Sequence, residues 1–101
     1  MALYEVSAEA QEHHFEIGCH IADDSLDLAI RIDAEFHELF TALGLMPGQG
    51  HTRKDLTPRP VRFFALYSYM VVYQPTAKPV RIMAVLRGRR DVKRFLKERL
   101  N

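Results

Sequence analysis

The side chains best suited to bind another molecule form a dense basic run at residues 87–94. Guanidinium and ammonium groups attract anionic surfaces, and they can do so without forming a covalent bond. Five of these eight positions are basic, and we predict that they bind the protein's target: Arg87, Arg89, Arg90, Lys93 and Arg94.

The charges are divided unevenly along the chain. Residues 1–50 hold ten acids and one base, Arg31, whereas residues 51–101 hold thirteen bases and three acids. The formal net charge of +1 conceals this split. Such an asymmetry predicts an anionic partner for the basic half, electrostatic contacts between the two halves, or both.

The residues with metal-ligating chemistry are His13, His14, Cys19 and His20, all within one expected helix. Positions 13 and 20 lie two turns apart, about 10 Å along a helix axis, and positions 13 and 14 point about 100° apart. These side chains are too dispersed to share one ion. We also find no Gly-rich phosphate loop, nucleophile elbow or paired-carboxylate pattern, and therefore expect no metal and no cofactor.

Length and composition predict one small globular domain spanning residues 1–101. Hydrophobic residues make up 48% of the chain and charged residues 27%, which is typical of a folded protein. No apolar run is long enough to span a bilayer, and the first residues lack the features of a signal peptide. The only cysteine, Cys19, cannot form an internal disulfide. We expect a cytoplasmic protein with no membrane partner.

Apolar spacing predicts an acidic helical hairpin in the first half of the chain. After a short strand at 3–6, Ser7 is suited to cap a helix over about 8–22. Ser25 is suited to cap a second helix that runs to about Leu43 and stops at Gly44.

The second half is predicted to form strands and one last helix. Residues 45–60 hold three prolines and two glycines and are expected to be a loop. Strands are expected at 61–66, 69–74 and 80–86, joined as an antiparallel meander, and Asp91 is expected to cap the final helix. The order β-α-α-β-β-β-α predicts an α+β, two-layer domain, with the helical hairpin packed on one face of a mainly antiparallel sheet.

The opposite face of this sheet is a second candidate binding surface. In the last strand, apolar residues occur at both odd and even positions, so each face keeps some of them. An open face that mixes apolar and basic groups is seldom left uncovered. We predict that a protein partner binds in a groove there, lined by Met70, Arg81, Met83 and Val85.

Four short motifs in register resemble the ParE/RelE superfamily, the toxins of bacterial toxin–antitoxin operons. The residues that carry the resemblance are Ser7-Ala8-Glu9-Ala10, the turn from Pro47 to Gly50, the strands with Arg62-Phe63-Phe64 and Tyr69 to Tyr73, and Ile82 to Asp91. Together they cover almost the whole chain. The resemblance implies a RelE/ParE-like fold and the toxin component of a type II toxin–antitoxin system.

Two activities occur in that superfamily, and the residues favour one of them. The RelE-like branch is known for cleaving messenger RNA on the ribosome, with basic sheet residues and a Tyr or His near the C-terminus. Here Met70 stands where such ribonucleases usually have an arginine, and the tail at 93–101 has neither Tyr nor His. Methionine cannot transfer a proton. The alternative of a ribosome-dependent endoribonuclease would have to use Arg62, Arg90 and a tyrosine such as Tyr69 or Tyr73.

Resemblance to the ParE-like branch implies a binding protein rather than an enzyme. Such toxins are known for acting on DNA gyrase, and a cognate antitoxin, ParD-like or of another type II class, would wrap and neutralise the toxin. Direct nucleic-acid binding is not expected. A third interpretation is a degenerate member that serves only as an antitoxin-binding or operator-regulating partner. The antitoxin class and the stoichiometry are not encoded in this chain alone.

Overall fold

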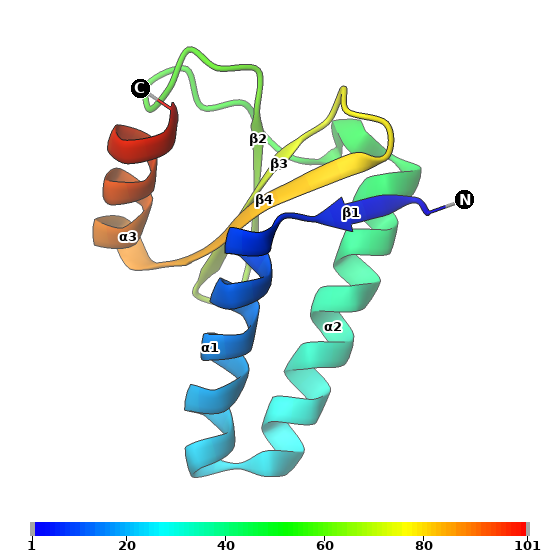
Figure 1. Ribbon diagram of the computed structural model, residues 1–101, viewed down its shortest axis with the longest axis vertical. Coiled ribbons are helices and arrows are strands. Elements are labelled where there is room, and N and C mark those ends of the chain that lie inside the picture. The colour runs from blue at the N-terminus through cyan, green and yellow to red at the C-terminus, as the bar shows by residue number, and fades with distance from the viewer. Residues whose placement is uncertain (1, 101) are drawn as a thin grey trace.

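A computed structural model describes residues 2–100 of the chain (Figure 1). The expected order of strands and helices is confirmed. The elements are β1 (Tyr4–Val6), α1 (Ala8–Asp24), α2 (Leu26–Leu45), β2 (Arg62–Leu66), β3 (Tyr69–Gln74), β4 (Val80–Arg87) and α3 (Gly88–Phe95), with a 3₁₀ turn at Pro47–Gln49 and a π-helical turn at Leu96–Leu100. Within residues 2–100, no helix is both long and apolar enough to cross a bilayer.

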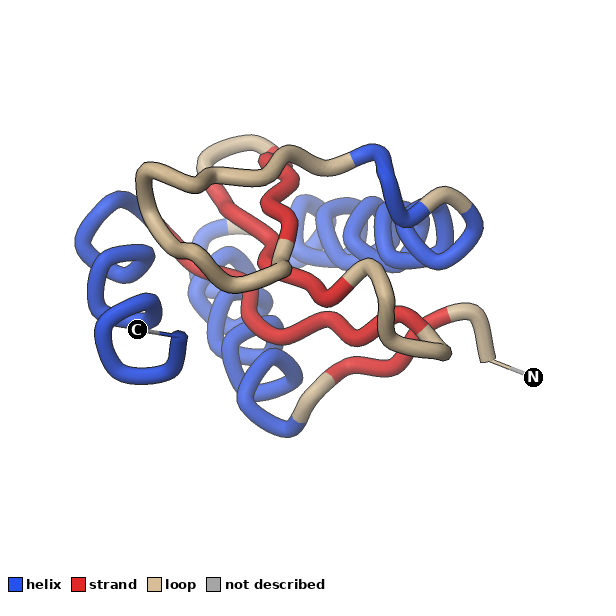
Figure 2. The backbone as a smooth tube through the Cα atoms, turned by 90° about the horizontal axis from the view of Figure 1, so that it is seen from above, coloured by secondary structure: helices blue, strands red, loops and turns tan. Residues whose placement is uncertain are grey.

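The four strands form one sheet in the order β1-β4-β3-β2. The pairs β2–β3 and β3–β4 are antiparallel, as the meander predicts. β1 lies parallel to β4 at the edge, with Tyr4 opposite Val80, although their positions in the sequence are far apart. The sheet is therefore mainly antiparallel, with one parallel pair. Figure 2 shows the strands between helices that lie on both sides of them.

The hairpin of α1 and α2 packs on one face of the sheet and extends beyond it (Figure 1). The core between these layers includes Phe36 and Phe40 of α2 with Val71 and Ile82 of the sheet, all fully buried. The predicted α+β architecture with a helical hairpin on the sheet is thus confirmed.

The other face of the sheet is more covered than the sequence predicts. A second buried cluster joins Phe63, Val72 and Ala84 of the sheet to Phe95 of α3 and Leu100 of the C-terminal turn. The prediction of an open opposite face is wrong where α3 lies, because the apolar stripe of that helix closes over it.

A β-bulge breaks the expected alternation of β4. Val72 pairs with Ala84 and Tyr73 pairs with Ile82, so Met83 has no opposite residue. An extra residue of this kind shifts every later side chain to the other face. As a result Val85 points toward the hairpin, where it is 3% exposed.

The N-terminal caps of α1 and α2 agree with the sequence prediction, and that of α3 does not. The Ser7 hydroxyl accepts a hydrogen bond from the Ala10 amide, and the Ser25 hydroxyl accepts one from Leu28, which confirms both predicted caps. The predicted cap at Asp91 is wrong, because α3 already begins at Gly88, whose φ of +75° turns the chain out of β4. Asp91 lies instead in the first helical turn, where it complements the helix dipole.

Gly44 does not end α2, which continues to Leu45. A Cβ atom at Gly44 would lie 2.6 Å from the carbonyl oxygen of Leu3 and 2.9 Å from its carbonyl carbon. This glycine is therefore required so that the chain leading into β1 can cross the end of α2.

Gly44→Ala is expected to destabilise the domain by about 1–3 kcal/mol, since a new Cβ meets backbone that cannot move without displacing β1. Gly18→Ala in α1 is the matched control, because nothing lies within 4 Å of its added Cβ. That substitution should stabilise the protein by about 0.5–1 kcal/mol, the usual gain for alanine within a helix. The free energy of unfolding of both variants can be measured by urea denaturation. Equal changes of the same sign would contradict the close approach of Leu3 to Gly44.

Candidate partner-binding surfaces

The five predicted target-binding residues lie at the corner between β4 and α3, and all are exposed. We call them the basic corner: Arg87, Arg89, Arg90, Lys93 and Arg94. Within residues 2–100, none of them forms an ion pair with a carboxylate within 4.0 Å. The basic corner is a dense group of positive charges without direct carboxylate partners in the described part of the chain.

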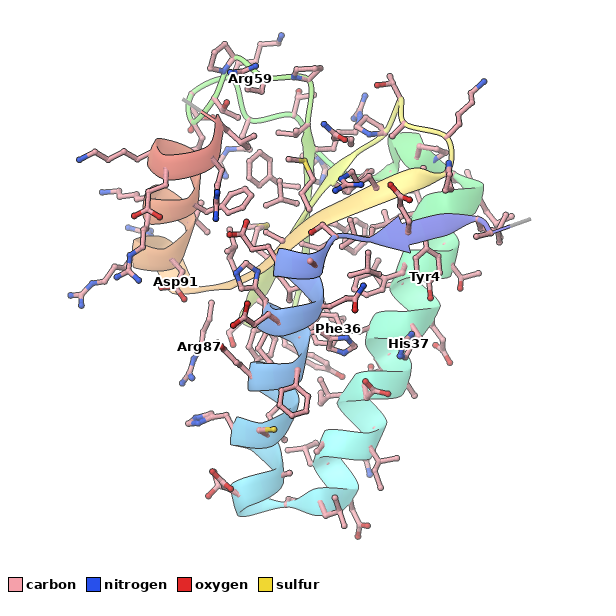
Figure 3. The ribbon with its side chains drawn as sticks, in the orientation of Figure 1. Tyr4, Phe36, His37, Arg59, Arg87 and Asp91 are labelled. Carbon is pink, nitrogen blue, oxygen red and sulfur yellow. The ribbon has the colours of Figure 1, made fainter. Side chains whose placement is uncertain are left out.

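The basic corner borders a cleft between α1 and α3 with a volume of about 450 Å³. Arg87 and Arg94 line it from one side, facing Glu9 and Glu16 of α1 on the other. Figure 3 shows Arg87 and Asp91 at the entry to α3. The other three residues of the basic corner do not line this cleft: Arg89, Arg90 and Lys93. The predicted site therefore consists of two residues at the cleft and three on the outer surface.

Two ion pairs join the acidic half to the basic half. Arg99 donates to Glu9 at 2.8 Å, and Arg81 donates to Glu5 at 2.7 Å. Both pairs are solvent-exposed, and such pairs contribute only about 0–1 kcal/mol each. The charge split therefore serves partly as contact between the halves, and among residues 2–100 such pairs use only Arg81 and Arg99 of the thirteen bases in the second half.

The four predicted groove residues do not share one open surface. Met70 and Met83 are half-buried against the cluster beneath α3. Arg81 is exposed and paired with Glu5. Val85 lies on the opposite face, and its amide donates to the Nδ1 atom of His13 at 3.3 Å. The expectation that Val85 lines an open groove is wrong, because the bulge at Met83 reverses its direction.

Two of the residues considered for ribonuclease chemistry have structural partners. Tyr73 is fully buried, and its hydroxyl donates to the Pro47 carbonyl at 2.7 Å and accepts from the Gly50 amide at 2.8 Å. Burial raises the pKa of Tyr73, so it remains a neutral phenol. Arg62 donates to the Gly50 carbonyl at 2.7 Å. Both side chains hold the loop after α2 against the sheet.

The other two residues considered for ribonuclease chemistry are Tyr69 and Arg90. Tyr69 is half-buried, with its ring centroid 5.8 Å from that of Phe36. Arg90 is exposed at the start of α3. The described chain does not bring Arg90, Arg62 and Tyr73 into one solvent-open site, because the last two are engaged with the loop after α2.

Sequence reasoning missed a cluster formed by His14 of α1 with Asp33 and His37 of α2. His14 Nε2 lies 3.1 Å from Asp33 Oδ1, and His37 Nε2 lies 3.5 Å from Asp33 Oδ2. Burial lowers the pKa of His14, although the charge of Asp33 opposes the shift. The sequence feature that points to this cluster is the i, i+4 spacing of Asp33 and His37 on one helix. This spacing indicates a cluster only when the hairpin places His14 of α1 opposite the two residues.

Comparison with known proteins gives a family and a fold. Residues 4–92 match the family model of the ParE toxin of type II toxin-antitoxin systems, parDE. The chain is also similar to a chain in the solved structure of the chromosomal ParDE TA system from P. aeruginosa, with a TM-score of 0.70 and 18% identity. That alignment covers 85% of this chain and 95% of the other, and it shows a shared fold. No curated protein matches.

Proposed function

Because this chain belongs to the ParE toxin family of type II toxin–antitoxin systems, we propose that it is a non-enzymatic toxin that binds DNA gyrase in the cytoplasm. The observation that supports this most is the basic corner, which is exposed and has no ion pairs among residues 2–100. Such a surface attracts an acidic partner and needs no reacting group of its own.

The proposed mechanism is a shift in the conformational population of the target. A protein that binds the DNA-cleaved state of gyrase more tightly than the resealed state raises the fraction of cleaved complexes. The outward cations of the corner, Arg89, Arg90 and Lys93, would contact gyrase, and Arg87 and Arg94 would extend the site into the α1–α3 cleft. Exposed charges also speed the encounter with an acidic surface.

The antitoxin is the second proposed partner. An amphipathic and partly disordered segment of a ParD-like antitoxin would order on binding and wrap the toxin. Arg81 offers it an exposed cation, and Met70 and Met83 offer partly exposed, adaptable apolar contacts. Val85 has no part in this surface because it is buried.

The experiment is induced expression in a bacterial host, followed within minutes by assays of DNA and messenger RNA. We expect DNA damage signalling and gyrase-linked plasmid cleavage while messages remain intact. Purified protein added to gyrase and plasmid DNA should likewise accumulate cleaved complexes. Rapid message cleavage with undamaged DNA would instead support the endoribonuclease alternative, and no growth effect would support the degenerate member.

A further inference from the structure

We propose that His14, Asp33 and His37 form a binding site for a divalent transition-metal ion of the zinc class. The site would join α1 to α2, on the side of the hairpin away from the basic corner. This inference does not depend on the proposed action on gyrase.

The distances within the cluster already approach those of a metal site. One ligand atom from each residue lies within 4.8 Å of the other two. Zinc binds imidazole nitrogen and carboxylate oxygen at about 2.0–2.2 Å, which places tetrahedral ligands about 3.3–3.6 Å apart. The two His–Asp separations are close to this range, although they involve different carboxylate oxygens: 3.1 Å from His14 to Asp33 Oδ1 and 3.5 Å from His37 to Asp33 Oδ2. Binding of one ion requires side-chain rotations that bring these three ligand atoms, which lie within 4.8 Å of one another, to such separations.

An unsatisfied nitrogen provides a second observation. The Nε2 atom of His14 is buried and has no hydrogen-bond partner among the described residues, even though Asp33 Oδ1 lies only 3.1 Å away. The distance allows a hydrogen bond, but the direction does not. Buried polar atoms of this kind are rare and require an explanation. A cation between the nitrogen and the carboxylate would satisfy both atoms.

Both imidazole rings have neighbours that favour their present orientation. The hydroxyl of Tyr4 in β1 lies 3.5 Å from Nδ1 of His37, the nitrogen that does not face Asp33. A partner on the far nitrogen is what metal-binding histidines usually have. The ring of His14 packs edge-on against Phe36, with centroids 5.1 Å apart. Figure 3 shows Tyr4 and His37 together along α2, with Phe36 nearby.

An ion can also reach the cluster. The three residues line a groove of about 750 Å³ along α1 and α2. The side chains of Asp33 and His37 are each 56% exposed, whereas that of His14 is 16% exposed. Three protein ligands with one side open to solvent leave room for water as a fourth ligand. Because the ligands come from both helices, binding would stabilise the hairpin.

The test uses the untagged full chain, stripped with a chelator and titrated with ZnCl₂ by calorimetry at pH 7.5. We expect one ion per chain, and the midpoint of thermal unfolding should rise by on the order of 10 °C at a hundredfold excess over Kd. Co²⁺ should give the absorption spectrum of a nitrogen- and oxygen-ligated ion.

His37→Ala and Asp33→Ala should each weaken zinc binding by roughly 100-fold or more, and Tyr4→Phe by roughly 10-fold through loss of the ring partner. His20→Ala is the matched control, an exposed histidine of α1 outside the cluster, and should bind zinc as the original chain does. Both altered ligands are exposed, so circular dichroism should show folded variants. Absence of zinc uptake at millimolar concentration, or an equal loss in His20→Ala, would overturn the proposal.

Discussion

Replacing Arg90 and Lys93 together with glutamate is expected to abolish toxicity while the domain remains folded. Both residues are exposed and form no ion pair among residues 2–100. The change reverses two charges that would face an acidic target, and we expect target affinity to fall by at least ~30-fold, since lost charge pairs at interfaces cost about 2 kcal/mol or more. Viable counts after induction measure the effect.

The matched control is Lys54→Glu with Lys78→Glu, which changes the net charge by the same amount. Both lysines are exposed on loops outside α3. This control should remain toxic, because the net charge alone does not form the site. Thermal unfolding should be nearly unchanged in both double variants. A soluble, fully toxic Arg90/Lys93 variant would remove these residues from the site.

Gly50→Ala is expected to have the largest effect on stability of the substitutions considered. A Cβ atom at this position would lie 2.5 Å from the Tyr73 hydroxyl and 2.8 Å from its ring. Tyr73 is fully buried and would lose its hydrogen bonds to Gly50 and Pro47. Overpacking costs about 1–3 kcal/mol and an unsatisfied buried hydroxyl about 1–3 kcal/mol more, so the loss should be about 2–6 kcal/mol.

Gly48→Ala, two residues earlier in the same loop, is the control. Nothing lies within 4 Å of a Cβ atom there, and the residue is exposed. Urea unfolding should give a midpoint close to that of the original chain for Gly48→Ala and a much lower midpoint for Gly50→Ala. If both variants matched the original chain, Tyr73 would not be anchored to this loop as described.

The parts of the fold that depend on neighbouring residues were predictable. Ser7 and Ser25 cap their helices because a side-chain hydroxyl acts on an amide three residues later. The three antiparallel strands follow from short apolar runs with breaks between them. Motif order then identified the superfamily, which the family match over residues 4–92 confirms.

The parts that depend on distant residues were not predictable. The bulge at Met83 is set by the pairing of β3 with β4, and no local pattern in β4 reveals it, so Val85 was assigned to the wrong face. α3 begins at Gly88 because the chain must turn back over the sheet, which overrides the capping tendency of Asp91. The expectation of no metal rests on residues of α1 alone. His14 of α1 lies near Asp33 and His37 of α2 only because the hairpin packs the two helices together.

The pairing of β1 with β4 also sets when the sheet can be completed during synthesis of the chain. β1 is the first element to be translated, and its partner residues 80–82 emerge 76 positions later. Until then β1 has no strand to pair with, and the helical hairpin can pack only against β2 and β3. Contacts so distant in sequence form late in folding. A chain truncated upstream of β4 would therefore lack Val80, Ile82 and Val85 of the core and the whole basic corner.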